Sequence, residues 1–264
     1  MRNCAGVVFL FDATIHRRMA NLTISCNRTL PMQGNVKDDP VALLQGDIAV
    51  FRRDLLEWFE KNRRDFYWRS EDASLYVRIV SEVLLQRTQA RTASNFLPAF
   101  LDAFPTWNAI AEAGQDVLEE VLRPIGLWRR RATALFALAS EVVRRGGIWP
   151  LSRQELESIP AVGQYVASAI LLFQHNSRAP LLDASMARLL RRYFAITPEL
   201  ADIRYDKGLQ KVAHEVLACG DPVALNWAIL DFAAIQCRKP AGGCMSCALK
   251  QGCRQFQVKQ NPDC

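Results

Sequence analysis

The sequence has no apolar run that approaches the roughly 18–20 residues needed for a membrane-spanning helix. The apolar stretch at residues 7–11 is too short for the core of a secretory signal. Sustained alternation of apolar and polar residues, the pattern typical of strands, is missing, and no segment is repeated. These absences argue against a membrane protein and against a β-sheet fold. We therefore expect an all-α, cytoplasmic protein.

The composition is compatible with a packed core and with a negatively charged partner. Half of the 264 residues are hydrophobic, which is ample for one or two domains, and the formal net charge is +6. Most of the positive charge is arginine, which either keeps the surface soluble or binds a polyanion, since its guanidinium group suits phosphate. Composition alone does not decide between these roles. Residues 1–45 lack sustained periodicity, and we expect them to be disordered.

The segment 152–192 holds the most informative local pattern. Ser152 and Glu155 have the spacing of a capping box, which predicts the start of a helix. A turn at 160–163 follows and leads into an apolar helical run at 165–173. Such a turn points backbone N–H groups outward at the start of a helix, where the helix dipole is positive, and this arrangement suits a phosphate.

Asp183 stands at the start of the next predicted helix. Apolar residues recur on one face of this helix, and arginines occupy the opposite face. The apolar residues are Met186, Leu189, Leu190, Tyr193 and Phe194, and the arginines are Arg188, Arg191 and Arg192. One carboxylate therefore lies between a phosphate-binding turn and a basic face, where we expect the chemistry. The simpler role of Asp183 is an ordinary helix cap.

The remaining apolar patterns predict further helices at 47–59, 75–96, 97–104, 116–122, 129–145, 206–219 and 223–235, the first capped by Asp47. Glu82 lies beside the apolar face of the second, either as an exposed charge, which is the usual state of glutamate, or as a partly buried acid with a raised pKa. Three arginines at 129–131 oppose the dipole of their helix, which indicates an external anion or a solvated run of charge. Trp68 is expected to pack in the core.

Four of the eight cysteines lie close together near the C-terminus: Cys237, Cys244, Cys247 and Cys253. Their spacing, C-x6-C-x2-C-x5-C, suits a [4Fe–4S] cluster, which takes four thiolates. Zinc is the main competitor, but it is usually bound by two closely spaced pairs, and only the middle pair is close here. The other cysteines are scattered, which favours a metal site in a reducing compartment over a disulfide framework. We expect the cluster to be structural.

Three motifs, taken in order, resemble the helix-hairpin-helix DNA glycosylase superfamily in its endonuclease III and MutY branch. They are the hairpin at 159–163, Leu181-Leu182-Asp183 and the cysteine spacing. The resemblance covers about residues 47–253 and implies two helical lobes that clamp DNA around a flipped base. It assigns 70–182, with the hairpin at 152–174, to a six-helix barrel lobe, and 46–69 plus 183–236 to a second lobe. Residues 237–253 would form the cluster loop and 254–264 a tail.

The resemblance also implies catalytic roles. Asp183 matches the aspartate that stabilises positive charge on the sugar or activates water, and Glu82 matches the MutY acid that protonates the departing base. Tyr165 stands where bifunctional relatives have a lysine that attacks the sugar as an amine, so we expect no efficient lyase activity.

Contacts to DNA are implied in the same way. A wedge that enters the gap left by the flipped base matches Leu85, Gln86 and Arg87. The phosphate-binding hairpin, which in relatives also holds a monovalent cation, matches Ala161, Val162 and Gly163. Phosphate contacts are expected from Arg129, Arg130 and Arg188. Ala161 replaces the usual glycine, so a positive φ there would cost about 1 kcal/mol.

The chain length and the segments 62–66, 182–184 and 230–235 look closer to the thymine–guanine mismatch glycosylases of this branch. They imply a monofunctional, monomeric, nucleoid-associated enzyme of base excision repair. Its substrate would be thymine or uracil opposite guanine in duplex DNA, and it would hydrolyse the N-glycosidic bond of that base. Adenine opposite guanine or 8-oxoguanine is the alternative substrate, although Ser185 stands where MutY relatives usually have asparagine. A non-catalytic DNA-binding protein is the alternative from another class.

Overall fold

The structure, a computed structural model, describes residues 44–238 and 243–260. The segment 1–45, predicted to be disordered, lies outside the described residues except for its last two positions, which start the first helix. The described helices are α2 (Gln45–Asn62), η3 (Tyr67–Arg69), α3 (Leu75–Leu85), α4 (Ala90–Ala103), α5 (Trp107–Leu122), η4 (Arg123–Ile125), α6 (Trp128–Arg144), α7 (Arg153–Glu157), α8 (Gln164–His175), α9 (Ala184–Phe194), η5 (Ile203–Tyr205), α10 (Lys207–Leu217), α11 (Pro222–Ile235) and α12 (Arg254–Gln260).

The described ranges contain no strand, which confirms the all-α prediction. Small polar side chains cap several helices by accepting a backbone N–H, because that group has no partner within the helix itself. These caps are Ser74, Thr106, Ser152, Asp183, Asp206 and Asp221. Of the helices described, none is both long enough and apolar enough to cross a membrane.

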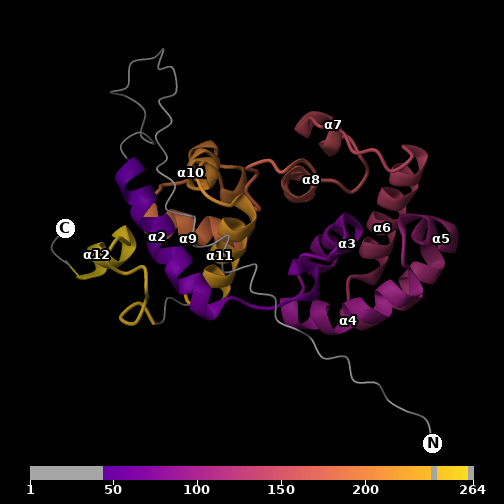
Figure 1. The fold of residues 1–264 in the computed structure, drawn as a ribbon, viewed down its shortest axis with the longest axis horizontal. Helices are drawn as coiled ribbons and strands as arrows, with labels where there is room; N and C mark the ends of the chain where they lie inside the picture. The colour runs from indigo at the N-terminus through magenta and orange to yellow at the C-terminus, as the bar shows by residue number, and fades with distance from the viewer. Residues whose placement is uncertain (1–43, 239–242, 261–264) are drawn as a thin grey trace, which may run out of the picture. The chain divides into compact units, whose positions relative to one another are not determined.

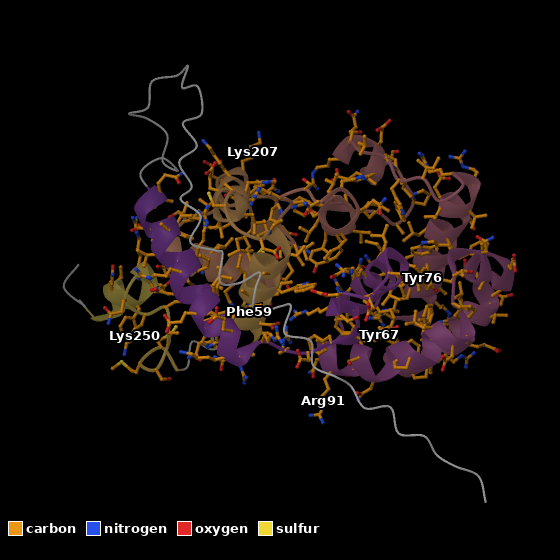
Figure 2. All side chains as sticks on the ribbon, viewed as in Figure 1. Phe59, Tyr67, Tyr76, Arg91, Lys207 and Lys250 are labelled. Atoms are coloured by element: carbon orange, nitrogen blue, oxygen red, sulfur yellow. The ribbon has the colours of Figure 1, made fainter. Side chains whose placement is uncertain are left out.

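The helices pack in two groups, which meet where α8 contacts α11. The first group consists of α2, α9, α10, α11 and α12, so the first described helix packs with the last ones (Figure 1). The second group consists of α3 to α8. Side chains fill the space between the helices (Figure 2). Tyr76 of α3, which the figure labels, packs edge-on against Trp107 of α5. Trp68 is buried, as predicted.

The prediction of one helix over residues 75–96 is wrong. The helix ends after Leu85, and α4 begins at Ala90. Between them, Gln86 leaves helical geometry (φ −57°, ψ 111°) and Arg87 is left-handed (φ 58°). Glycine is the usual residue in the left-handed conformation that ends a helix. Position 87 is an arginine, so the sequence does not indicate that the helix ends here. The predicted boundary at 96–97 does not exist either, because α4 continues through Pro98.

The structure adds a helix to the tail, changes the cap of α2 and extends one predicted helix. The tail predicted at 254–264 contains α12, and its Arg254 forms an ion pair with Asp47 at 2.6 Å. Asp47 lies in the first turn of α2 and does not cap it, because the helix begins at Gln45. The helix predicted at 116–122 is present as the second part of α5, after a kink at Gly114 (φ 78°), whereas the first part, from Trp107 to the kink, was not predicted.

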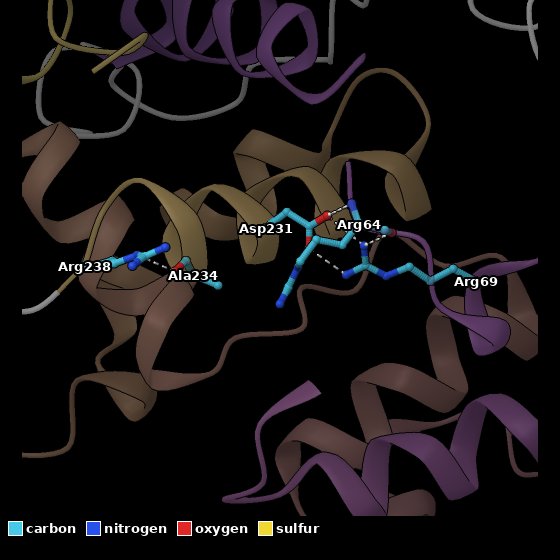
Figure 3. A network of polar contacts seen from close by, with 5 residues as sticks. All are labelled: Arg64, Arg69, Asp231, Ala234 and Arg238. Atoms are coloured by element: carbon cyan, nitrogen blue, oxygen red, sulfur yellow. Dashed lines mark hydrogen bonds and ion pairs between the residues drawn. The ribbon is translucent and has the colours of Figure 1, made fainter. Parts of the chain in front are cut away.

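A buried carboxylate joins α11 to the segment that connects α2 with α3 (Figure 3). Asp231 is fully buried and accepts hydrogen bonds from Arg64 Nε at 2.7 Å and from the two terminal nitrogens of Arg69 at 2.8 and 2.9 Å. Arg69 also lies over the rings of Phe66 and Trp227. A charge removed from water is costly unless it is paired, so each member of this network depends on the others.

We expect Asp231→Asn to lower the free energy of unfolding by about 3–5 kcal/mol, because it leaves two largely buried guanidinium groups without their carboxylate. Urea denaturation followed by circular dichroism measures this loss. The control Glu57→Gln removes an exposed ion pair with Lys61 (side chains 68% and 70% exposed) and should change stability by less than about 1 kcal/mol. Two variants of equal stability would contradict the role given to Asp231.

Candidate active site

Glu82 is buried within α3. The residue is 3% exposed, so the exposed state favoured by residue type alone is wrong. Burial penalises the charged form and raises the pKa of Glu82 to about 7. The hydrogen bond from Tyr165 and the charge of Arg69 lower this pKa, whereas the charge of Asp183 raises it. Near neutral pH the carboxyl group can therefore both hold and release a proton.

Tyr165 is the hydrogen-bond partner of Glu82. It lies in the first turn of α8, which packs against α3, and its hydroxyl donates to Glu82 Oε2 at 2.9 Å. Burial raises the pKa of the Tyr165 hydroxyl well above its ordinary value, and the charges of Glu82 and Asp183 raise it further. The hydroxyl is therefore neutral and acts as a hydrogen-bond donor.

Asp183 caps α9, as its position in the sequence suggested. Its Oδ1 accepts the backbone N–H groups of Ser185 at 2.9 Å and Met186 at 2.7 Å. Burial raises the pKa of Asp183, while these two N–H groups and the charges of Arg188 and Arg204 lower it. Its Oδ2 has no hydrogen-bond partner within the described part of the chain. One oxygen thus serves the helix and the other is available for chemistry.

These three side chains act on one another although they are far apart in sequence. Glu82 comes from α3, Tyr165 from the start of α8 and Asp183 from the start of α9. Glu82 and Tyr165 share a hydrogen bond, and the charge of Asp183 raises the pKa values of both. We refer to Glu82, Tyr165 and Asp183 as the acid cluster.

Two arginines that influence the acid cluster were not singled out from the sequence. Arg69 lowers the pKa values of Glu82 and Tyr165, and Arg204 lowers the pKa of Asp183. Arg69 is the last residue of η3, directly after the buried Trp68. Its effect depends on tertiary contacts, so no local pattern reveals it.

The hairpin between α7 and α8 has unpaired backbone N–H groups. Ser152 accepts the N–H of Glu155 at 3.2 Å, which confirms the predicted cap of α7. Ala161 is left-handed (φ 65°), the strained conformation expected if alanine replaces glycine. Within the described residues the N–H groups of Ala161 and Gly163 have no partner, and no side chain caps α8. That of Val162 is already bonded to a carbonyl, 3.0 Å away on Ile159.

The predicted wedge residues lie in the turn between α3 and α4. Gln86 and Arg87 are exposed there, and Leu85 is half-buried. Arg129 and Arg130 are exposed in the first turn of α6, and the guanidinium of Arg129 lies over the Trp128 ring at 4.0 Å.

Arg188, expected to contact phosphate, is half-buried and hydrogen-bonded within the protein. Its guanidinium donates to the carbonyl of Ala233 at 3.0 Å and to that of Cys237 at 3.0 and 3.1 Å. Arg131, also predicted to answer an external anion, is only 4% exposed. Both arginines satisfy backbone carbonyls inside the protein, a role that a sequence pattern cannot distinguish from phosphate binding.

The four C-terminal cysteines line a cavity of about 140 Å³ beside α9. All four are free thiols, and Arg192 Nη1 lies 3.4 Å from Cys237 Sγ. Burial raises the pKa of the Cys247 thiol to about 11. In the described ranges no group of three or more histidine, cysteine, aspartate or glutamate residues is placed to hold a single metal ion.

Comparison with known proteins decides the family. Residues 80–214 match the model for the HhH-GPD superfamily base excision DNA repair protein. A thymine-DNA glycosylase of Aeropyrum pernix is 33% identical over 215 residues, which cover 79% of this chain and 95% of that protein. The chain belongs to the HhH-GPD superfamily of base excision DNA repair proteins.

Two other known proteins are similar to this chain at lower identity. The adenine DNA glycosylase of Homo sapiens is 26% identical over 80% of this chain and 40% of its own length. The solved structure of a thermostable thymine-DNA glycosylase has a TM-score of 0.71 and 26% identity, covering 80% of this chain and 97% of that one. The resemblance inferred from the motifs and the predicted enzyme class, a DNA glycosylase, are thus confirmed.

We expect wild type to lose about 2–3 kcal/mol of its free energy of unfolding between pH 5 and pH 8, and Glu82→Gln not to lose it. Relative to wild type, the variant is therefore more stable at pH 8 than at pH 5. The pKa of Glu82 rises from 4.5 to about 7 on folding. Between these values the folded chain keeps a proton that the unfolded chain has lost, so wild-type stability falls as the pH rises through this window. Glutamine has no such proton.

Urea titrations at the two pH values measure this difference, with the exposed Glu57→Gln as the control. A gain that is the same at pH 5 and pH 8 would show that Glu82 is not the titrating group.

Proposed function

We propose that this DNA glycosylase removes thymine or uracil mispaired with guanine and leaves an abasic site without cutting the strand. The observation that carries the proposal is the acid cluster, in which Tyr165 donates to a buried acid with a pKa near 7, and the charge of Asp183 raises that pKa. The choice of base is supported by the names of two similar proteins, both thymine-DNA glycosylases.

Asp183 and Glu82 divide the work of breaking the glycosidic bond. The bond between sugar C1′ and the base nitrogen breaks, and its electron pair leaves with the base. The ionised Asp183, with its unpartnered Oδ2, stabilises the positive charge that develops at C1′. Protonated Glu82 donates to the departing base, a contribution typically worth ~10²–10⁴-fold in rate. Water supplies the oxygen that bonds to C1′, and the proton that it releases restores Glu82.

Tyr165 supports hydrolysis over strand cleavage. A bifunctional enzyme needs an amine that forms a Schiff base with the sugar. Tyr165 has no amine, and its hydroxyl is held neutral and occupied by Glu82. Its place in the mechanism is therefore to orient the acid and to form part of the base pocket.

Duplex DNA would be held by the unpaired N–H groups of the hairpin and by the exposed Arg129 and Arg130. The N–H groups of Ala161 and Gly163 lie at the positive end of the α8 dipole, which suits a phosphate oxygen. A monovalent cation at the hairpin stays a prediction. Leu85, Gln86 and Arg87 would enter the stack from the turn after α3, while the two predicted helical lobes clamp the duplex from either side.

Adenine is the second candidate base, and one observation favours it. The pKa of Glu82 lies near 7, so a protonated acid is available at neutral pH, and adenine needs protonation to depart more than thymine does. The human relative is an adenine DNA glycosylase.

The four cysteines fit a [4Fe–4S] cluster, which we propose as a structural cofactor. Cys237, Cys244, Cys247 and Cys253 line one cavity, and Arg192 beside Cys237 would favour a thiolate. The thiols need not converge on one point, because each thiolate of a cubane binds a different iron. Gly252 leaves room for Tyr193, whose hydroxyl would clash with any Cβ added there. The bound cluster would supply cross-links within the C-terminal loop and between that loop and Cys237, which follows α11.

We expect the purified chain to excise thymine or uracil from T:G and U:G duplexes and to act less on A:G and A:8-oxoguanine. Strand breaks should appear only after alkali or heat, and borohydride should trap no covalent complex. Asp183→Asn should lower the single-turnover rate by about 10²–10³-fold, because it removes the charge that faces C1′. Asparagine is also a good helix cap, so this variant should fold.

The matched control is Asp221→Asn, a second helix cap that accepts the N–H groups of Val223 and Ala224 at an exposed position. It should leave the rate unchanged. Tight binding of mismatched DNA without abasic sites would favour the non-catalytic DNA-binding protein, and a higher rate on A:G than on T:G would favour adenine.

We expect anaerobically purified protein to hold about four iron atoms and to absorb broadly in the visible range. Cys247→Ser should lose most of the iron, whereas Met245→Ala, an exposed neighbour (71%) in the same loop, should keep it. Metal analysis measures both. One zinc per chain in place of iron would overturn the cluster assignment.

A further inference from the structure

Arg131 is a buried cation that the proposed mechanism does not use. It lies in the first turn of α6 and is 4% exposed. Among the residues that the structure describes, no carboxylate forms an ion pair with it. A buried guanidinium without a counter-ion is costly unless hydrogen-bond acceptors replace the water that it has lost.

The acceptors of Arg131 come from two turns. Nη1 donates to the carbonyl of Ile125 at 2.8 Å and to that of Gly126, in the turn that precedes α6. Nη2 donates to the carbonyl of Gln86 at 2.8 Å and to the hydroxyl of Thr88, in the turn between α3 and α4. A longer contact reaches the carbonyl of Leu84 at 3.4 Å.

The turn that Arg131 holds is strained and exposed at its tip. Arg87 has φ 58°, a left-handed conformation that non-glycine residues rarely adopt. Such a conformation persists only where the surroundings enforce it. Arg131 binds the residues on both sides of Arg87, namely Gln86 and Thr88, and therefore holds Arg87 in this conformation.

Arginine suits this position and lysine does not. The planar guanidinium directs several N–H groups at fixed angles, so it can bind both turns at once. The ammonium group of lysine is a compact charge with three donors and cannot reproduce the fork. Among the described residues Nε of Arg131 has no partner, so the site is built around the two terminal nitrogens.

We propose that Arg131 is a positioning residue that presets the turn Leu85–Arg87 in the shape required to enter the base stack. This inference rests on the proposed function, because it takes that turn as the wedge. Arg131 itself does not reach the DNA. It hydrogen-bonds the turn to the segment before α6, so the turn is already ordered in the free protein. The entropy cost of ordering the wedge is then not added to the cost of flipping the base.

The test measures base unstacking without excision. A duplex carries 2-aminopurine beside a T:G mismatch, and a 2′-fluorine on the mismatched thymidine resists glycosidic cleavage. Saturating wild-type protein should raise the fluorescence as the stack opens. Arg131→Lys should lower the opening equilibrium about tenfold or more, as a displaced positioning group does. Arg144→Lys, an exposed substitution on the same helix (67%), should behave as wild type.

Two further variants separate positioning from general damage to the fold. Thr88→Ala removes one acceptor of Arg131 and should reduce opening in the same direction, even if Arg131→Lys folds poorly. Leu85→Ala shortens the wedge side chain and should itself reduce base opening. In that background Arg131→Lys should reduce opening by less than about a further twofold, because the effects of substitutions that act through one element are not additive.

Unchanged opening in Arg131→Lys and Thr88→Ala would overturn the inference, and so would an undiminished effect in the Leu85→Ala background. Opening by wild type together with no excision of an ordinary T:G duplex would overturn the proposed function and leave the inference standing.

Discussion

The hydrogen bond from Tyr165 to Glu82 is the interaction on which the site depends. A carboxyl group removed from water favours its neutral form unless donors and cations offset the loss. Glu82 receives one neutral donor, Tyr165, and the charge of Arg69, while Asp183 opposes its ionisation. The pKa near 7 is the balance of these opposing influences. The packing of α3 against α8 and the cap that begins α9 therefore set the acidity of one side chain, as well as its position.

Arginine serves two purposes in this chain, and burial separates them. Arg69 holds the buried Asp231, and Arg188 and Arg131 satisfy backbone carbonyls where the chain turns. Exposed arginines such as Arg129 and Arg130 remain for a polyanion. A basic net charge thus overstates the surface available to DNA. The guanidinium group is suited to both purposes, because it offers several directed donors and never loses its charge.

Sequence reasoning succeeded where the physics is local. The cap of α9 by Asp183, the left-handed Ala161 and the helical composition follow from side-chain hydrogen bonding, steric strain and periodicity within a few residues. It failed at the break after Leu85 and at Arg131, which depend on each other across more than forty residues. The burial of Glu82 lies between these cases: the residue alone favoured exposure, and the motif around it pointed to the correct state.

The pairing of Tyr165 with Glu82 also bears on the proposed release of the base by water. A lysine at position 165 would place a cation beside Glu82, lower its pKa and hold it in the ionised form that cannot donate a proton. The carboxylate would in turn keep the lysine protonated and unable to attack the sugar. A tyrosine supplies the same hydrogen bond with no charge, so the acid keeps its proton near neutral pH. Release of the base by water is then the reaction that this pair of residues favours.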